Sequence, residues 1–268
     1  MNRKFKIIVL AKQVPDTRQV GRDAMNADGT VNRAALPAVF NPDDLNALEL
    51  ALEIKDRCPG STVTMLTMGP ERAKDIVLEG MQRGADAGVL LTDRLFAGAD
   101  TLATSYALSM AIRRIGEYDM IVCGRQAIDG DTAQVGPQVA EKLGLNQITY
   151  VEKLLDIDDG SVTVRRAITG GVETVKAPLP VLLTVNGTAA PCRPRNAKLI
   201  MSRKKYQVPA WSVDDVRADA ALCGLSGSPT KVRKIENIVF QAKESRRYDP
   251  DDEGIGSLVR ELSSNHII

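Results

Sequence analysis

The sequence has few of the residues on which several common kinds of chemistry depend. Aromatic residues make up only 4% of its 268 positions, which argues against a stacking platform for nucleic-acid bases. His266, close to the end of the chain, is the only histidine. A serine or cysteine nucleophile activated by histidine therefore has little support.

The cysteines are also few and scattered. They are far apart and include no CxxC pair: Cys58, Cys123, Cys192 and Cys223. This spacing disfavours a metal or iron–sulfur site and is typical of the reduced thiols of a cytoplasmic protein.

Neither charge nor hydropathy points to a nucleic acid or a membrane. The formal net charge of +1 gives no case for nucleic acid or for an acidic membrane surface. No apolar run approaches the roughly 18 residues of a membrane span. The first apolar run, residues 6–11, is too short for the core of a signal peptide. We therefore expect no membrane span and a cytoplasmic location.

The first half of the chain alternates short apolar runs with helical patterns. The runs are typical of buried parallel strands and cover Phe5–Ala11, Val63–Met68, Val89–Leu91 and Met120–Cys123. The intervening segments have apolar residues at helical spacing. This order predicts an α/β fold with a doubly wound, mostly parallel sheet.

The character of the sequence changes after Ile148. Four strand-like runs, separated by Asp158-Asp159-Gly160 and Gly170-Gly171, predict antiparallel strands at one edge of the sheet. The basic segment 190–205 is either a solvated loop with a helix end or a docking site. Residues 207–268 contain only short amphipathic pieces, so we expect an extended C-terminal arm that packs on another surface. We accordingly predict a nucleotide-binding domain over residues 1–190 and a docking loop with the arm over residues 191–268.

The stretch Tyr118–Gly136 gathers polar residues where a buried strand ends. Gly124 ends the strand, residues 129–131 are expected to form a turn, and Thr132 is expected to open a helix. Free N–H groups at such a helix start favour a phosphate. The alternative is an ordinary strand–helix connection with a capped start.

The side chains of this loop suit a nucleotide better than a bare anion. Thr132 adds a hydroxyl donor, and the amides of Gln126 and Gln134 suit a ribose or a second phosphate oxygen. Asp129 and Asp131 oppose an anion unless they point at sugar hydroxyls or cap the helix.

Two further helix starts carry candidate residues. Asn41 precedes Pro42 and an acidic first turn, so it is expected to cap a helix, with contact to a ligand as the less favoured role. Asp100 is a candidate cap for a later helix. Thr101 and Thr104 lie three residues apart on one helix face, where they serve either as caps or as contacts to a polar ligand.

Several motifs together resemble one family over nearly the whole chain. They are KQVPDT (12–17), the NPxD helix start with its ALELAL continuation, TMGP (67–70), GAD (84–86) and GRQAIDGDTAQVGP (124–137). These motifs resemble the β subunit of electron transfer flavoproteins. The resemblance implies a fold like that of the adenine nucleotide alpha-hydrolases and an α-subunit partner whose FAD shuttles electrons to dehydrogenases.

The resemblance also implies a nucleotide site. Its residues lie at strand ends, at one helix start and in the central loop: Leu10, Ala11, Asn41, Asp44, Met68, Gly124, Arg125, Gln126, Ala127, Ile128, Asp129, Gly130, Asp131, Thr132, Ala133, Gln134 and Val135.

The family has two branches, which differ in the ligand of this site. Ordinary members hold AMP there, whereas electron-bifurcating members hold a second FAD that takes a hydride from NADH and sends its two electrons along separate routes. This chain resembles the bifurcating branch through DRLFAGADTLATS (93–105), DGDTAQVGP (129–137) and GLSGSPTKV (224–232). The resemblance adds Asp100, Thr101 and Thr104 to the site, with the two threonines at the flavin end.

The implied partners follow from the same resemblance. They are the α subunit, a partner flavin dehydrogenase and a low-potential acceptor of the ferredoxin type. One departure concerns docking, because Ala197-Lys198 stands where AMP-type members carry an anchoring leucine followed by proline. We therefore expect a partner other than the usual acyl-CoA dehydrogenases, contacted through Arg193–Lys205.

Three functions remain open from the sequence. They are a bifurcating subunit with FAD, an ordinary electron-carrier subunit with AMP, and a nucleotide-binding protein without a redox role.

Overall fold

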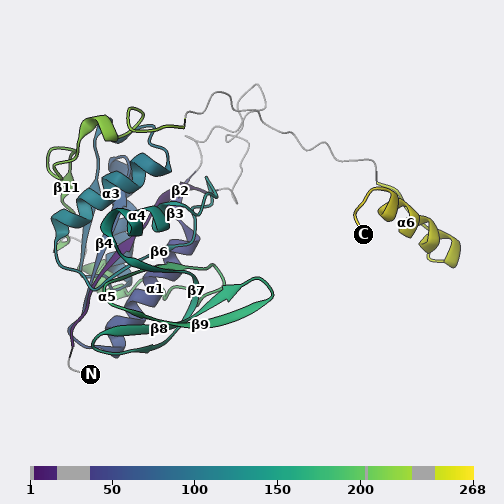
Figure 1. Cartoon of the computed structure of the whole chain (residues 1–268), viewed down its shortest axis with the longest axis horizontal. Helices are drawn as coiled ribbons and strands as arrows, with labels where there is room; N and C mark the ends of the chain where they lie inside the picture. Colours follow the sequence, from purple (N-terminus) through teal and green to yellow (C-terminus); the bar gives the residue numbers. More distant parts are fainter. Residues whose placement is uncertain (1–2, 17–36, 203–204, 231–244) are drawn as a thin grey trace. The chain divides into compact units, whose positions relative to one another are not determined.

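A nine-stranded sheet forms the centre of the computed structural model, which describes residues 3–16, 37–202, 205–230 and 245–268 (Figure 1). The strand order is β11-β5-β4-β1-β6-β10-β7-β8-β9, and β2 and β3 form a separate antiparallel pair. The strands are β1 Lys6–Leu10, β2 Gln13–Pro15, β3 Ala38–Phe40, β4 Thr62–Met68, β5 Ala87–Leu91, β6 Met120–Gly124, β7 Asn146–Ile157, β8 Ser161–Ile168, β9 Gly171–Pro178, β10 Val181–Val185 and β11 Ala210–Trp211.

Helices cover both faces of this sheet. Side chains of α1 and α2 pack with one buried cluster that includes Leu48 and Val77, and side chains of α3 and α4 pack with another that includes Ala111 and Val139. The sheet is therefore doubly wound, as predicted. The helices are α1 Pro42–Arg57, α2 Lys74–Arg83, α3 Thr101–Ile115, α4 Val135–Leu143, α5 Ala197–Met201 and α6 Asp252–Ser264.

The chain reverses direction across the sheet at β1. From β1 it proceeds outward through β4 to β5, and it then returns to β6 on the other side of β1, with all these strands parallel. In open α/β sheets, ligands bind outside the carboxyl ends of the strands at such a switch point. The carboxyl ends of β1 and β6 are thus the place to look for a site.

The antiparallel edge is confirmed, with one difference in detail. β7 pairs with β8, and β8 with β9, in antiparallel fashion. β10 was expected among the antiparallel strands, but it lies inside the sheet and pairs in parallel with both β6 and β7. Its five residues are all buried, as the uninterrupted apolar run Val181–Val185 indicates for a central parallel strand.

The last part of the chain divides into two differently packed portions. Residues 1–233 form one compact unit and residues 234–268 a second. Within the first unit, β11 pairs with β5, and Val213, Val216 and Cys223 are buried in the cluster on the α3 side. In the second unit, α6 has no buried residue. The docking role predicted for residues 191–268 stays a prediction. The sequence also predicts a surface hairpin or loop over residues 20–40, of which residues 20–36 lie outside the described part.

Burial of α1 against the sheet predicts a measurable dependence of stability on Leu48. Its side chain is 0% exposed. Replacing it with alanine (Leu48→Ala) should lower the free energy of unfolding by about 2–5 kcal/mol, because it removes buried methyl groups and leaves a cavity. Urea denaturation followed through the fluorescence of Trp211, the only tryptophan, measures this change.

Leu258→Ala in α6 is the matched control, because Leu258 is 39% exposed and its removal should change stability by no more than about 0.5 kcal/mol. Equal effects of the two substitutions would contradict the packing described for α1.

Candidate functional site

The predicted site residues converge at the carboxyl ends of three adjacent parallel strands. Leu10 ends β1, where it pairs with Leu66 of β4 and with Cys123 of β6. Ala11 directly follows β1, and Met68 and Gly124 are the last residues of β4 and β6. The structure therefore brings together motifs that lie more than a hundred positions apart in the sequence.

Asn41 has a different role from the cap that the sequence predicts. It precedes α1, but its side chain makes no capping hydrogen bond. Its Nδ2 donates to the carbonyl oxygen of Gln126 at 2.8 Å, and its Oδ1 accepts the N–H of Ile128 at 3.1 Å. Asn41 is 0% exposed, so both ends of its amide are used inside the protein. Asn41 therefore fixes the loop after β6 rather than the start of its own helix.

Asp44, one turn further along α1, holds the two strand ends. Its Oδ2 accepts the N–H of Lys12 at 2.8 Å, and its Oδ1 accepts the N–H of Gly124 at 2.9 Å. The helix start packs very closely here, because a Cβ added to Gly124 would lie 2.5 Å from Asp44 Oδ1. Burial raises the pKa of the Asp44 carboxyl to about 7, although the two amide hydrogen bonds oppose that rise.

Each of the two aspartates of the loop has a side-chain partner, a lysine for one and a glutamine amide for the other. Asp129 forms an ion pair with Lys12 Nζ at 2.8 Å, and Asp131 Oδ1 accepts a hydrogen bond from Gln126 Nε2 at 2.7 Å. Because these partners neutralise or orient the carboxylates, the aspartates no longer count as strongly against an anionic ligand.

The loop backbone is strained where it approaches α4. Asp131 and Ala133 have φ values of 48° and 53°, in the left-handed region that side chains other than glycine rarely adopt. This conformation explains why α4 begins at Val135 and not at Thr132, as the sequence predicts. Strain of this kind clusters at ligand sites, where the surrounding structure maintains it.

The same segment presents backbone donors that the protein does not use. Within the described residues, the N–H groups of Ala127, Asp129, Thr132 and Ala133 make no hydrogen bond. The first N–H groups of α4 also lack a side-chain cap, because Gln134 supplies none. A left-handed turn followed by an uncapped helix start is an arrangement of amides that suits phosphate oxygens.

The start of α3 lies against the end of this loop. Asp100 caps α3 as predicted, accepting the N–H groups of Leu102 and Ala103. Thr101 does not act as a cap; its hydroxyl donates to Gln134 Oε1 at 2.9 Å. The Thr104 hydroxyl, on the same helix face, has no hydrogen-bond partner among the described residues. Thr104 is therefore available to a ligand, whereas Thr101 joins the two helix starts.

Two further residues are part of this arrangement: Lys12, which the sequence-based site omitted, and Asp43, which lies within the helix start 41–44 predicted for that site. Lys12 pairs with Asp129, and its position directly after β1 is the signal that could have identified it. Asp43 lies 4.0 Å from Arg125 Nε, and the Arg125 guanidinium lies over the Tyr150 ring. Burial raises the pKa of Asp43, while the Arg125 charge opposes that rise.

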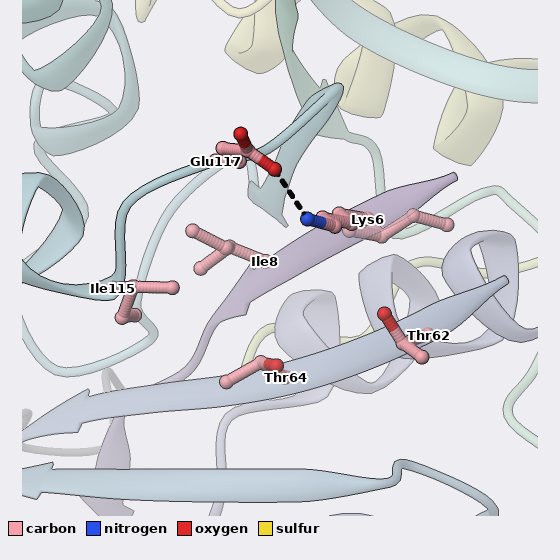
Figure 2. Close-up of a pocket in the computed structure, with 7 residues that line it drawn as sticks. Lys6, Ile8, Thr62, Thr64, Ile115 and Glu117 are labelled. Carbon is pink, nitrogen blue, oxygen red and sulfur yellow. Dashed lines mark hydrogen bonds and ion pairs between the residues drawn. The ribbon is translucent and has the colours of Figure 1, made fainter. Parts of the chain in front are cut away.

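A hollow of about 320 Å³ lies at the amino ends of the strands, opposite the candidate site, and shares no residue with it. It is lined at the amino ends of β1 and β4, where Lys6 Nζ forms an ion pair with Glu117 at 2.5 Å (Figure 2). Its open, charged lining contains none of the predicted residues.

None of the helices in the described segments is long and apolar enough to cross a membrane.

Comparisons with known proteins identify the class to which this fold and site belong. The profile of the Electron transfer flavoprotein domain matches residues 28–216. The "Electron transfer flavoprotein subunit beta" of Clostridium acetobutylicum is 44% identical over 264 residues, which is 98% of this chain and 100% of that protein. The chain therefore belongs to the electron transfer flavoprotein family, as a β subunit.

Two further relatives come from named reductase systems. The "Caffeyl-CoA reductase-Etf complex subunit CarD" of Acetobacterium woodii is 41% identical over 98% of this chain and 100% of its own length. The "Acryloyl-CoA reductase electron transfer subunit gamma" of Anaerotignum propionicum is 42% identical over 98% of this chain and 100% of its own length.

The Asn41 contacts predict that Asn41→Asp will disturb the site. The substitution removes the donor to the Gln126 carbonyl and places a buried negative charge against it, while the acceptor for Ile128 remains. We expect the free energy of unfolding to fall by at least about 1–3 kcal/mol, the cost of an unsatisfied buried group. The affinity for an adenine nucleotide, measured by calorimetric titration, should fall about tenfold or more.

Asn46→Asp is the matched control, because Asn46 Nδ2 donates to the carbonyl groups of Ala189 and Ala190 from the same helix. That variant should lose stability and keep its nucleotide affinity. A similar loss of affinity in both variants would show that Asn41 has no special relation to the loop.

Asp44 predicts a pH dependence with a definite sign. Its pKa is raised in the folded protein, so the protonated form contributes stability that is fully present below about pH 4 and is lost as the pH rises through about 7. Asp44→Asn does not titrate, so the stability of the wild type relative to this variant should decrease across that window, by about 4 kcal/mol at most. Urea denaturation at a series of pH values measures the difference, and a difference that grows with pH would contradict the assignment.

Proposed function

We propose that the chain is the small subunit of an electron-bifurcating electron transfer flavoprotein and that the loop after β6 binds an FAD. The observation that carries the proposal is a set of backbone N–H groups that make no hydrogen bond within the described residues, at Ala127, Asp129, Thr132, Ala133 and the start of α4, beside the switch point between β1 and β6. These amides suit the diphosphate of a dinucleotide.

The residues present fit such a cofactor. The amides near Thr132 and Ala133 and the first turn of α4 would hold the diphosphate, and the Thr104 hydroxyl, which has no described protein partner, would contact the ring system. Asn41 and Asp44 would act indirectly, because their side chains already bind backbone groups of the protein. Their part is to keep the loop in the conformation that exposes its amides.

An FAD bound here would supply the redox chemistry: it would accept a hydride from NADH and release single electrons along two routes. The chain's own side chains would bind and orient the cofactor and set the charge around it. Lys12, Asp129, Arg125 and Asp43 form two opposite-charge pairs along the loop, and such nearby charges tune a cofactor's electronic properties.

The choice of branch is supported by two relatives that are named as parts of reductase systems. The competing function is an ordinary electron-carrier subunit that binds AMP at the same loop. The loop amides suit both ligands, whereas a free hydroxyl at Thr104 favours a ligand that extends beyond an adenylate. Family membership argues against the third alternative, a nucleotide-binding protein without a redox role.

The proposed partners are an α subunit with its own FAD, a flavin dehydrogenase and a low-potential acceptor of the ferredoxin type, in the cytoplasm. Residues 193–205 and the C-terminal unit are the proposed docking segments. α6 exposes Ile255, Leu258 and Val259, which suits a helix that packs on a partner.

Identification of the nucleotides released from the purified complex with its α subunit tests this function. The proposal predicts two FAD molecules per heterodimer and reduction by NADH. One FAD together with one AMP would support the ordinary carrier instead.

Thr104→Val is predicted to separate the two ligands. The substitution keeps the shape of the side chain and removes a hydroxyl that has no described partner in the protein, so stability should be unchanged. We expect the affinity for FAD at this site to fall about fivefold to tenfold, as for one lost hydrogen bond, and the affinity for AMP to stay within about twofold. Equilibrium dialysis of the heterodimer with each nucleotide measures both constants.

Thr62→Val, at the opposite edge of the sheet, serves as the control and should leave both constants unchanged. Equal weakening of FAD and AMP by Thr104→Val would contradict the flavin contact.

A further inference from the structure

Asp100 binds a segment near the end of the first compact unit as well as the helix that it caps. Asp100 Oδ2 accepts the backbone N–H of Thr230 at 3.1 Å and the Thr230 hydroxyl at 2.7 Å. The N–H of Asp100 donates to Ser228 Oγ at 2.8 Å. Since Oδ1 accepts two amides from the first turn of α3, four donors of the protein occupy the carboxylate. Asp100 is therefore a junction between α3 and residues 224–230, not a free cofactor ligand.

Residues 224–230 are seated against the loop that precedes α3. Ser228 is 5% exposed, and its hydroxyl donates to the carbonyl oxygen of Gly224 at 2.7 Å. The N–H of Leu225 donates to the Ala97 carbonyl at 3.0 Å. Gly224 has a φ of 51°, and a Cβ at this position would lie 2.1 Å from the Leu95 carbonyl oxygen. Residues 224–230 therefore have a defined binding position, the seat, to which Asp100 contributes.

Two sets of hydrogen bonds, linked by the peptide bond between Asp100 and Thr101, connect residues 224–230 with the nucleotide loop. Gln134, at the start of α4, accepts the hydroxyl of Thr101, and Thr101 directly follows Asp100. The path therefore runs from the loop through two helix starts to Thr230. Beyond this segment, the chain continues to the second compact unit, residues 234–268.

We propose that Asp100 is a positioning residue that couples nucleotide binding at the loop of residues 124–134 to the seating of residues 224–230. The inference rests on the proposed function only in taking that loop as the nucleotide site. A ligand that orders the loop and Thr101 stabilises the helix start, and the helix start holds the segment that leads to the C-terminal unit. Coupling of this kind is reciprocal, so releasing residues 224–230 from Asp100 lowers the affinity for the nucleotide by the same factor.

Contiguity alone does not establish coupling, so the test measures it in the heterodimer with the α subunit. Hydrogen exchange of the amides of residues 225–228 is compared with and without a saturating nucleotide, using FAD and AMP as separate probes. In the wild type, the probe that binds should slow this exchange about tenfold, within the usual range of coupling between sites.

The double variant Ser228→Ala with Thr230→Val removes both side-chain contacts to Asp100. Its nucleotide-dependent protection should fall below twofold, and its affinity for the same probe should weaken about tenfold. Thr230→Val alone should give an intermediate loss of protection and of affinity. Because Thr230 is exposed, this variant shows whether the effect of the double variant comes only from misfolding around the buried Ser228. Ser212→Ala is the matched control, because Ser212 makes an equivalent hydroxyl–carboxylate contact with Asp215 in the same part of the chain.

Unchanged protection and affinity in the double variant would overturn the proposal, as would the absence of protection by either nucleotide in the wild type. Protection by AMP and not by FAD, lost in the double variant, would support the coupling while contradicting the flavin site. Failure of the coupling and failure of the proposed function are thus distinguishable.

Discussion

The site depends on one set of hydrogen bonds, those by which the first turn of α1 holds the loop after β6. Asn41 binds Gln126 and Ile128, and Asp44 binds the chain at Lys12 and Gly124. Both side chains are buried, where an unsatisfied polar group is costly. The loop is therefore held at its strand end, and its far end can keep the left-handed conformation in which backbone N–H groups remain unused.

The sheet topology gives these contacts their location. Because β1 lies between β4 and β6, the loops after these strands open at one edge, on either side of the point where the chain reverses. The start of α1 reaches this edge beside β6, and the starts of α3 and α4 meet there through Thr101 and Gln134. Three helix N-termini thus border one polar region, a setting that favours a phosphate-bearing ligand.

Much of this arrangement could be predicted from the sequence, and the exceptions have physical reasons. The strands and the cap at Asp100 follow from apolar periodicity and local capping chemistry. The role of Asn41 could not be predicted, because its partners lie 85 and 87 positions away and the local pattern favours a cap. The late start of α4 depends on the positive φ values of Asp131 and Ala133. Aspartate tolerates this region better than most residues, but alanine favours the helix and gives no signal of it. The parallel pairing of β10 with β6 and β7 depends on long-range contacts, which hairpin signals in the local sequence do not indicate.

An experimental structure of the complex with its α subunit is the most direct test of the account. It should show a diphosphate within hydrogen-bonding distance of the amides of Thr132, Ala133 and the first turn of α4, with a ring system extending towards Thr104. A nucleotide bound elsewhere on the chain, or a loop whose amides point away from any phosphate, would contradict it.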